Sequence, residues 1–277
     1  MKNDFIQGKT VLVTGSTDGI GLETAKQLAE MGAHVLLHGR DKGKGVQAVK
    51  KITQATCYGS VDLYLADFSS FKQVKRLADE ISRENNALHG LINNAGNFYN
   101  QRYLNESGFE MTFAVNYLAP FLLTMLLLDL LKTSAPARIV NVASSAHRII
   151  QRIDFENLQG EKRYDPFEAY ALSKLGNVLF SNALAERLKS THVTVNALHP
   201  GVVATKLLKK SYDLDGISAA DGAATSVKLA AGMDVAKITG KYFRNAQQRQ
   251  PSDVAMDEKN QEKMWKITRE MLGRYLE

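Results

Sequence analysis

The residues in this chain with the clearest capacity for chemistry are Tyr170 and Lys174. Side chains four residues apart on a helix lie one above the other on the same face. A lysine ammonium in that place favours the phenolate form of a tyrosine, whose pKa is ordinarily about 10, so the hydroxyl can exchange protons nearer neutral pH. An isolated pair of this kind more often lies on an ordinary amphipathic helix, so its interpretation depends on the rest of the chain.

A glycine-rich segment follows the first apolar, β-rich run of the sequence. That run, residues 10–14, leads into Gly15-x-x-x-Gly19-x-Gly21 and then into a helical pattern. Strand, glycine loop and helix in this order predict a phosphate-binding turn, because glycines let the backbone approach a pyrophosphate and the helix start offers unpaired N–H groups. The alternative is a turn without a ligand, since the spacing differs from the commoner Gly-x-Gly-x-x-Gly.

The second apolar run, residues 34–38, ends in Gly39-Arg40-Asp41. In dinucleotide-binding folds an acid near this place binds the adenosine ribose hydroxyl, whereas an arginine accepts a 2′-phosphate. Arg40 therefore favours NADP over NAD, because a planar guanidinium suits a phosphate. Asp41 is either a hydroxyl acceptor or the cap of the next helix. The histidines within the strand, at positions 34 and 38, are expected to make packing contacts only.

Apolar runs and helical patterns continue to alternate along the chain. Further strands are expected at residues 60–66, 88–92, 138–143, 191–198 and 240–244, and helices at 42–53, 70–84, 106–131, 165–189 and 257–273. This alternation predicts one α/β domain over residues 1–277, a Rossmann-type doubly wound parallel sheet of about seven strands with helices on both faces. The irregular, lysine-rich segment 205–218 is a candidate substrate lid.

Polar residues follow several of these strands at their carboxyl ends, where open α/β sheets bind ligands. Asp67 is expected either to meet an adenine amino group or to cap the next helix. The others are Asn93-Asn94-Ala95-Gly96 after the fourth strand, and Ser144 and Ser145 after the fifth. Asn116 interrupts an apolar helix face; it is either a satisfied core group or a functional one, because a buried asparagine must be hydrogen-bonded.

Composition excludes several classes of protein. Hydrophobic residues make up 44% and charged residues 23% of the 277-residue chain, as in soluble globular proteins. The single cysteine, Cys57, excludes an internal disulfide framework. The net charge is +6, but the basic residues are not interleaved with aromatic ones, which argues against nucleic-acid binding. The most apolar run, 121–131, is shorter than the roughly 20 residues of a membrane span, and no signal peptide is recognisable, so a cytoplasmic protein is expected.

With these motifs in order, the chain resembles the short-chain dehydrogenase/reductase family from about residue 8 to residue 245. The matching motifs are Thr14-Gly15-x-x-x-Gly19-Ile20-Gly21, Asp67, Asn93-Asn94-Ala95-Gly96, Asn116, Ser144, Tyr170-x-x-x-Lys174 and Pro200-Gly201. It looks most like the retinol-dehydrogenase-like and protochlorophyllide-reductase-like branch. The cues are Gly39-Arg40-Asp41, Val142-Ala143-Ser144-Ser145-Ala146-His147, the long interval from Ser144 to Tyr170, and His199-Pro200-Gly201-Val202-Val203-Ala204-Thr205.

The resemblance implies hydride transfer between NADP and a carbonyl or alcohol. It implies that Tyr170 is the general acid and base, and that Lys174 lowers the pKa of the tyrosine and holds the nicotinamide ribose. Ser144, or Ser145 in its place, would donate a hydrogen bond to the substrate oxygen, and Asn116 would hold a water for proton delivery. The implied cofactor contacts are Gly15, Ser16, Thr17, Gly19, Ile20, Gly21, Arg40, Asp67, Phe68, Asn94, Ala95, Gly96, Tyr170, Lys174, Pro200, Gly201, Val203 and Thr205.

Several features of the substrate and partners remain open at this level. Aromatic and aliphatic residues near the site, Phe98, Tyr99, Tyr103, Ile149 and Ile150, indicate an apolar substrate such as an aldehyde, ketone, retinoid or steroid; core packing or a partner interface explains them equally well. The family resemblance implies a homodimer or homotetramer. A catalytically silent dinucleotide-binding sensor or scaffold is the main alternative function, and a nucleic-acid-binding module is the third.

Overall fold

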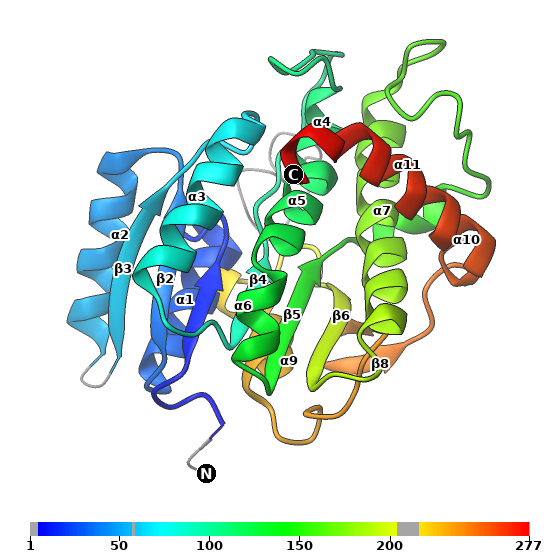
Figure 1. The fold of residues 1–277 in the computed structure, drawn as a ribbon. Helices are drawn as coiled ribbons and strands as arrows, with labels where there is room; N and C mark the ends of the chain where they lie inside the picture. Colours follow the sequence, from blue (N-terminus) through cyan, green and yellow to red (C-terminus); the bar gives the residue numbers. More distant parts are fainter. Residues whose placement is uncertain (1–4, 57–58, 204–215, 277) are drawn as a thin grey trace.

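The computed structural model describes residues 5–56, 59–203 and 216–276 of the chain. Its centre is an eight-stranded sheet with the order β3-β2-β1-β4-β5-β6-β7-β8, parallel throughout except for the last strand (Figure 1). The strands are β1 (Thr10–Val13), β2 (His34–Gly39), β3 (Ser60–Leu65), β4 (Gly90–Asn93), β5 (Ala137–Val142), β6 (Val193–His199), β7 (Lys241–Arg244) and β8 (Gln247–Arg249). The predicted single-domain, doubly wound α/β fold is confirmed.

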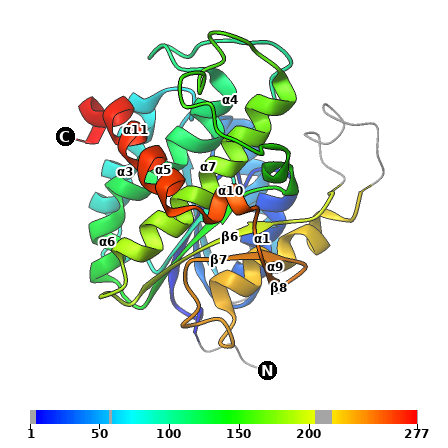
Figure 2. The ribbon, with the colours of Figure 1, turned by 90° about the vertical axis from the view of Figure 1, so that its right-hand side faces the viewer.

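Helices cover both faces of the sheet. On one face α1 (Gly19–Glu30) packs against α2 (Lys42–Ala55) and α9 (Ala219–Ala231). On the other face lie α3 (Phe71–Glu84), α5 (Ala119–Leu126), α7 (Pro166–Arg187) and the C-terminal α11 (Glu258–Leu276), as the two views show (Figures 1 and 2). Because the central strands are buried on both sides, β4 and β5 have no exposed residue, as is typical of parallel strands.

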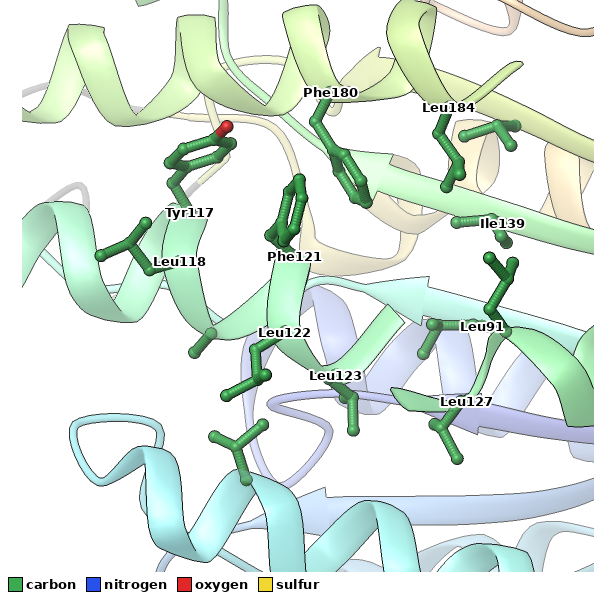
Figure 3. Packing of buried hydrophobic residues seen from close by; sticks show 14 of the residues in the cluster. Leu91, Tyr117, Leu118, Phe121, Leu122, Leu123, Leu127, Ile139, Phe180 and Leu184 are labelled. Atoms are coloured by element: carbon green, nitrogen blue, oxygen red, sulfur yellow. The ribbon is translucent and has the colours of Figure 1, made fainter. Parts of the chain in front are cut away.

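The larger core lies between the sheet and the layer of α5, α7 and α11 (Figure 3). Phe121 of α5 packs against Phe180 of α7, with ring centroids 4.7 Å apart, and against Trp265 of α11 at 5.1 Å. Aromatic pairs at such separations stabilise packing beyond the apolar area that they bury. This contact holds α7 in the layer that covers β5 and β6. Helix α7 carries Tyr170 and Lys174.

The predicted helix over residues 106–131 is wrong in its extent. The helical turns begin at α4 (Met111–Phe113), because the Glu110 side chain accepts hydrogen bonds from the N–H groups of Thr112 and Phe113, at 2.9 and 2.7 Å. A π-helical turn, η1 (Ala114–Leu118), precedes α5, and α6 (Leu128–Thr133) follows a break at Leu127. The apolar run that the sequence shows as one segment is therefore divided between two helices.

Strand β8 is the element that the sequence does not predict. Its three residues are polar and exposed, so no hydrophobic alternation marks it. It pairs antiparallel with β7 through a two-residue connection in which Asn245 and Ala246 have φ angles of 51° and 55°. Two consecutive positive φ angles are typical of the tight turn that joins such hairpins.

None of the helices in the described ranges combines the length and the apolar character that crossing a membrane requires.

Candidate active site

Helix α7 carries Tyr170 and Lys174 in its first three turns. The helix begins after Asp165, whose carboxylate accepts hydrogen bonds from the N–H groups of Phe167 and Glu168 at 2.9 and 2.8 Å. This cap, with proline at the first helical position, fixes where the helix starts. The Lys174 ammonium nitrogen lies 5.7 Å from the centre of the Tyr170 ring. The structure therefore places the phenol and the ammonium side by side, as their spacing predicts.

The Lys174 ammonium is buried inside the protein. It donates a hydrogen bond of 2.9 Å to the carbonyl oxygen of Val142, at the end of β5. Burial lowers the pKa of Lys174 to about 8, because the charged form loses its hydration. An ammonium has three donors, and this is its one hydrogen bond among the residues described. Two donors are left for a ligand such as a ribose diol.

Gly96 provides room beside this ammonium. A Cβ atom at Gly96 would lie 3.4 Å from both the Lys174 Nζ and the Asn116 Oδ1. That spacing is at the short end of van der Waals contact, so a side chain at position 96 would lie directly against both polar groups. The loop after β4 therefore brings backbone, and no side chain, next to the Lys174 ammonium.

Asn116 lies in the π-helical turn and is fully buried. Its Oδ1 accepts a 2.7 Å hydrogen bond from the Asn97 N–H, and its Nδ2 donates to the Asn97 carbonyl at 2.9 Å and to Ser173 Oγ at 3.2 Å. Of the two alternatives, the structure supports a satisfied core group that ties the loop after β4 to α7. π-Helical turns are frequent at functional sites, and a role for Asn116 in proton delivery stays a prediction.

The two candidate serines face different surroundings. Ser144 precedes the short helix η2 (Ser145–Ile149), and its Oγ accepts a hydrogen bond from the Ala146 N–H at 3.2 Å, which leaves the hydroxyl proton available. Ser145 instead lines a cavity with Arg148 and Tyr242. Ser144 also lies two residues after Val142, the residue whose carbonyl holds Lys174. Ser144 stays the predicted catalytic hydroxyl, with Ser145 as the alternative.

The glycine loop and the loop after β4 lie against each other. Gly15 has a φ angle of 63°, and a Cβ atom there would lie 2.8 Å from the Cα of Ala95. The Thr14 hydroxyl oxygen accepts hydrogen bonds from the N–H groups of Asn94 and Ala95 at 2.9 and 3.0 Å. Only glycine combines this backbone conformation with such an approach. The structure thus brings together two motifs that lie 80 residues apart in sequence.

A histidine that the sequence assigns only to packing holds the glycine loop. His38 Nδ1 accepts a 3.2 Å hydrogen bond from the Gly15 N–H, and His38 Nε2 lies 3.0 Å from the Ala66 carbonyl oxygen, to which it donates in this tautomer. The ring stacks on Phe68 with centroids 4.3 Å apart. The Ser16 hydroxyl is also buried, and it donates a hydrogen bond to the Val13 carbonyl oxygen at 2.7 Å. The Ser16 N–H also donates within the protein, to the His38 carbonyl oxygen at 2.9 Å, and the expected contact of Ser16 with a cofactor stays a prediction.

Burial lowers the pKa of His38 from 6.5 to about 4. The unfolded chain then binds more protons than the folded one between these two values, so we expect the free energy of unfolding to fall as the pH falls from 6.5 to 4. For this residue the loss is about 3 kcal/mol at most. Urea denaturation at pH 7 and pH 4.5 should show a smaller pH effect in His38→Gln than in the wild-type protein. The same substitution at the exposed His192 should leave the difference in unfolding free energy between the two pH values as in the wild-type protein. An unchanged difference in His38→Gln would contradict the contribution assigned to the buried His38.

The end of β2 presents an exposed guanidinium to the same region. Arg40 Nη1 lies 3.6 Å from Asp67 Oδ2, and both groups are open to solvent. Asp41 turns away, because its Oδ1 accepts from the Lys44 N–H at 2.9 Å and caps α2. The structure therefore selects the capping alternative for Asp41. Asp67 does not cap α3, which begins after Ser70.

The residues that follow β6 are described only in part. Gly201 has a φ angle of 96°, and Val203 forms an isolated bridge with Ile217. The predicted carboxamide contact at Thr205, and most of the lid candidate 205–218, lie outside the described residues. Pro200, Gly201 and Val203 continue β6 at the carboxyl edge of the sheet, as the sequence predicts.

Comparison with known proteins decides the family. The model of the short chain dehydrogenase family matches residues 9–215. The chain belongs to this family. This short-chain dehydrogenase is 42% identical to retinol dehydrogenase 12 of Mus musculus, over 98% of the chain and 88% of that protein. It is 40% identical to retinol dehydrogenase 13 of Homo sapiens, over 97% and 86% respectively.

Solved structures agree with this assignment. An uncharacterized protein from Mycobacterium paratuberculosis has a TM-score of 0.81 and 30% identity, over 98% of this chain and 97% of that one. A short chain dehydrogenase from Escherichia coli CFT073, complexed with NADPH, has a TM-score of 0.74 and 27% identity, over 89% and 100%. The short-chain dehydrogenase described here is therefore an NAD(P)-dependent oxidoreductase that acts on CH–OH or C=O groups, which disfavours a silent sensor or scaffold.

Proposed function

We propose that this short-chain dehydrogenase uses NADP to interconvert an apolar carbonyl compound and its alcohol, with Tyr170 as the proton donor and acceptor. The observation that carries the proposal is the buried Lys174 ammonium, held beside the Tyr170 ring with donors left for a ligand. Burying a charge without a carboxylate partner is costly, so a purely structural lysine is a poor explanation. In support, some of its structural neighbours are complexes with NADPH or NADP.

The described residues fit a dinucleotide. The start of α1 offers backbone N–H groups beside the glycine loop, and such groups bind phosphates. Lys174 would hold the nicotinamide ribose through its remaining donors, and Arg40 would hold a 2′-phosphate. When bound, the cofactor supplies or accepts the hydride.

Side chains of the protein would transfer the proton and stabilise the charge on the substrate oxygen. In reduction the Tyr170 hydroxyl gives its proton to this oxygen, and in oxidation the phenolate takes it back. The neighbouring Lys174 charge favours the phenolate and so eases both transfers. The Ser144 hydroxyl donates a hydrogen bond to the same oxygen as it gains charge, a contact worth a few kcal/mol in a typical transition state.

Aromatic side chains beside Tyr170 support an apolar substrate such as an aldehyde, ketone, retinoid or steroid. The Phe98 ring meets the Tyr170 ring edge-on at 5.9 Å and the Phe167 ring at 5.2 Å. Tyr103 and Ile149, which the sequence predicts to lie near the site, are about half exposed, at 50% and 54%. Large apolar groups that remain exposed near a site are typical of a surface that binds an apolar ligand. In addition, relatives of this chain are named retinol dehydrogenases.

A kinetic screen tests this function. NADPH and NADH are each offered with aliphatic, aromatic, steroid and retinoid carbonyls, and cofactor oxidation is followed at equal protein concentration. We expect faster oxidation of NADPH than of NADH with at least one apolar carbonyl. Binding of NADPH without oxidation across the whole panel would favour a dinucleotide-binding sensor instead. The cytoplasmic location and the homodimer or homotetramer stay predictions.

The cofactor preference has its own test. We expect Arg40→Ala to reduce kcat/KM for NADPH by about tenfold or more relative to NADH, because a charge-assisted contact to the 2′-phosphate is lost. The matched control is Arg83→Ala, which removes an equally exposed guanidinium on α3 that pairs with Glu84. The NADPH-to-NADH ratio should not change in the control. An unchanged ratio in Arg40→Ala would overturn the preference for NADP.

A further inference from the structure

A cavity of about 390 Å3 lies between the turn after β5 and the β7–β8 hairpin. Three guanidinium groups line it, those of Arg148, Arg244 and Arg249, together with Tyr242 and Ser145. Register explains the convergence, because Tyr242 and Arg244 alternate onto one face of β7 and Arg249 pairs with Tyr242 across the hairpin. The arginines therefore come from two distant segments and meet at one place.

The segments that carry these arginines are fastened to each other. Arg148 donates a hydrogen bond to the Gln250 carbonyl oxygen, and the neighbouring His147 Nε2 accepts one from the Ser252 N–H at 3.1 Å. The hairpin turn keeps Ala246 at a φ angle of 55°, and its N–H donates to Thr225 Oγ1 at 3.0 Å. A non-glycine residue in this conformation costs about 1 kcal/mol, so the surrounding contacts hold it there.

The cavity carries positive charge that no carboxylate of the described residues balances. Its lining contains no Asp or Glu, and the arginines that form ion pairs within residues 5–56, 59–203 and 216–276 are Arg40, Arg83, Arg163 and Arg187. Burial raises the pKa of Tyr242 to about 12, while the charges of Arg148 and Arg244 act in the opposite direction. Both guanidinium groups therefore act on one buried hydroxyl. The three arginine residues are exposed, and a bound anion would complement their charge.

The cavity borders the turn that carries Ser144. Ser145 lies in its wall, one residue after Ser144. Arg244 pairs in register with His199 of β6, which is buried. Burial first, and then charges that include those of Arg244 and Lys174, lower the pKa of His199 to about 4. The positive field of the cavity thus reaches the surroundings of the catalytic lysine.

We propose that this cavity is an anion site that binds a carboxylate or phosphate group through Arg148, Arg244 and Arg249. The planar guanidinium groups match the paired oxygens of such groups and bind them bidentately. Because the site adjoins the Ser144 turn, the anion is either an acidic group at the far end of the carbonyl substrate or a free anion bound beside it. The first source rests on the proposed function; the second does not.

The first arm of the test compares 12-oxododecanoate with its methyl ester, two aldehydes that differ in the terminal charge. For wild-type protein with NADPH at constant ionic strength, we expect kcat/KM to be about tenfold or more higher for the acid. Arg244→Gln and Arg249→Gln should each lower the acid-to-ester ratio toward one. The matched control is Lys241→Gln, because Lys241 lies on the opposite face of β7 and the variant loses the same charge. Its ratio should stay within about twofold of wild type, less than the loss of a charge-assisted contact.

The second arm needs no turnover. Inorganic phosphate is titrated against sodium chloride of equal ionic strength while the thermal midpoint is followed, since a ligand of the folded state raises it. A rise of the thermal midpoint in wild type and Lys241→Gln that disappears in Arg244→Gln and Arg249→Gln supports the site. If the first arm shows no preference for the acid, the same result assigns the site to a free anion. If neither aldehyde oxidises NADPH, that result counts against the proposed function for these two substrates and leaves the anion site to be decided by the phosphate titration. No acid preference and no phosphate effect would overturn the anion site.

Discussion

Tyr170→Phe should retain cofactor affinity while kcat falls by about 10²–10⁴-fold, the usual contribution of a positioned acid or base. The substitution removes only the hydroxyl, and the ring can keep its contact with Phe98 at 5.9 Å. Lys174, the residue proposed to hold the cofactor, is unchanged. Steady-state kinetics gives the loss of turnover, and quenching or enhancement of NADPH fluorescence gives the cofactor dissociation constant.

The matched control for this substitution is Tyr275→Phe. Tyr275 lies on the outer helix α11. The substitution deletes its phenolic hydroxyl, which makes a 2.7 Å hydrogen bond with Ser107 Oγ. We expect a small loss of stability there and no loss of turnover. Turnover by Tyr170→Phe within tenfold of wild type would refute the acid and base role of Tyr170, whereas an equal loss in Tyr275→Phe would indicate a general effect on folding.

Lys174→Met should abolish turnover and weaken cofactor binding, yet raise the free energy of unfolding. The pKa of Lys174 falls from 10.5 in the unfolded chain to about 8 in the folded one, so folding disfavours the ammonium. That shift corresponds to about 3 kcal/mol, and the loss of the hydrogen bond to the Val142 carbonyl offsets part of it. A net stabilisation of about 1–2 kcal/mol is expected, measured by urea denaturation.

The pH dependence of this stabilisation follows from the sign of the shift. Between pH 8 and 10.5 the unfolded chain binds the proton that the folded protein has released, so wild-type stability rises with pH in this window. The advantage of the methionine variant is therefore largest below pH 8 and shrinks above it. Lys51→Met, on the exposed face of α2, should show no such pattern. Destabilisation by Lys174→Met at pH 7 would contradict the cost assigned to the buried charge.

Local patterns in the sequence correctly predicted the sheet and the adjacency of Tyr170 and Lys174, because strand periodicity and a four-residue helical spacing depend only on neighbours. The helix over residues 106–131 was overextended, since its pattern does not reveal that Glu110 caps the first turn with its own carboxylate. The short strand β8 has no apolar residue to mark it. Elements defined by capping or by turn geometry are thus harder to predict than elements defined by burial.

The roles of individual polar residues depended on partners far away in sequence. His38 reaches Gly15 and Ala66, which lie 23 and 28 residues away, so the spacing of the motifs gave no sign of its contact. The same holds for the arginine cavity, where Arg148 bonds to Gln250, 102 residues later and directly after β8. Asp41 and Asp67 had two interpretations each. The hydrogen bond from the Lys44 N–H decided for capping at Asp41. At Asp67 the carboxylate accepts from the Ser69 N–H and does not cap α3, and its contact with adenine stays a prediction.

The activation of Tyr170 by a buried ammonium is tested most directly by the pH dependence of kcat/KM for NADPH, which reports ionisations of the free enzyme. With a carbonyl substrate from the screen, kcat/KM should fall as the pH rises through about 8, where Lys174 loses its proton. In Lys174→Arg, whose guanidinium stays charged, any residual activity should lose this decline. A wild-type profile that stays flat from pH 7 to pH 10 would contradict the role of Lys174.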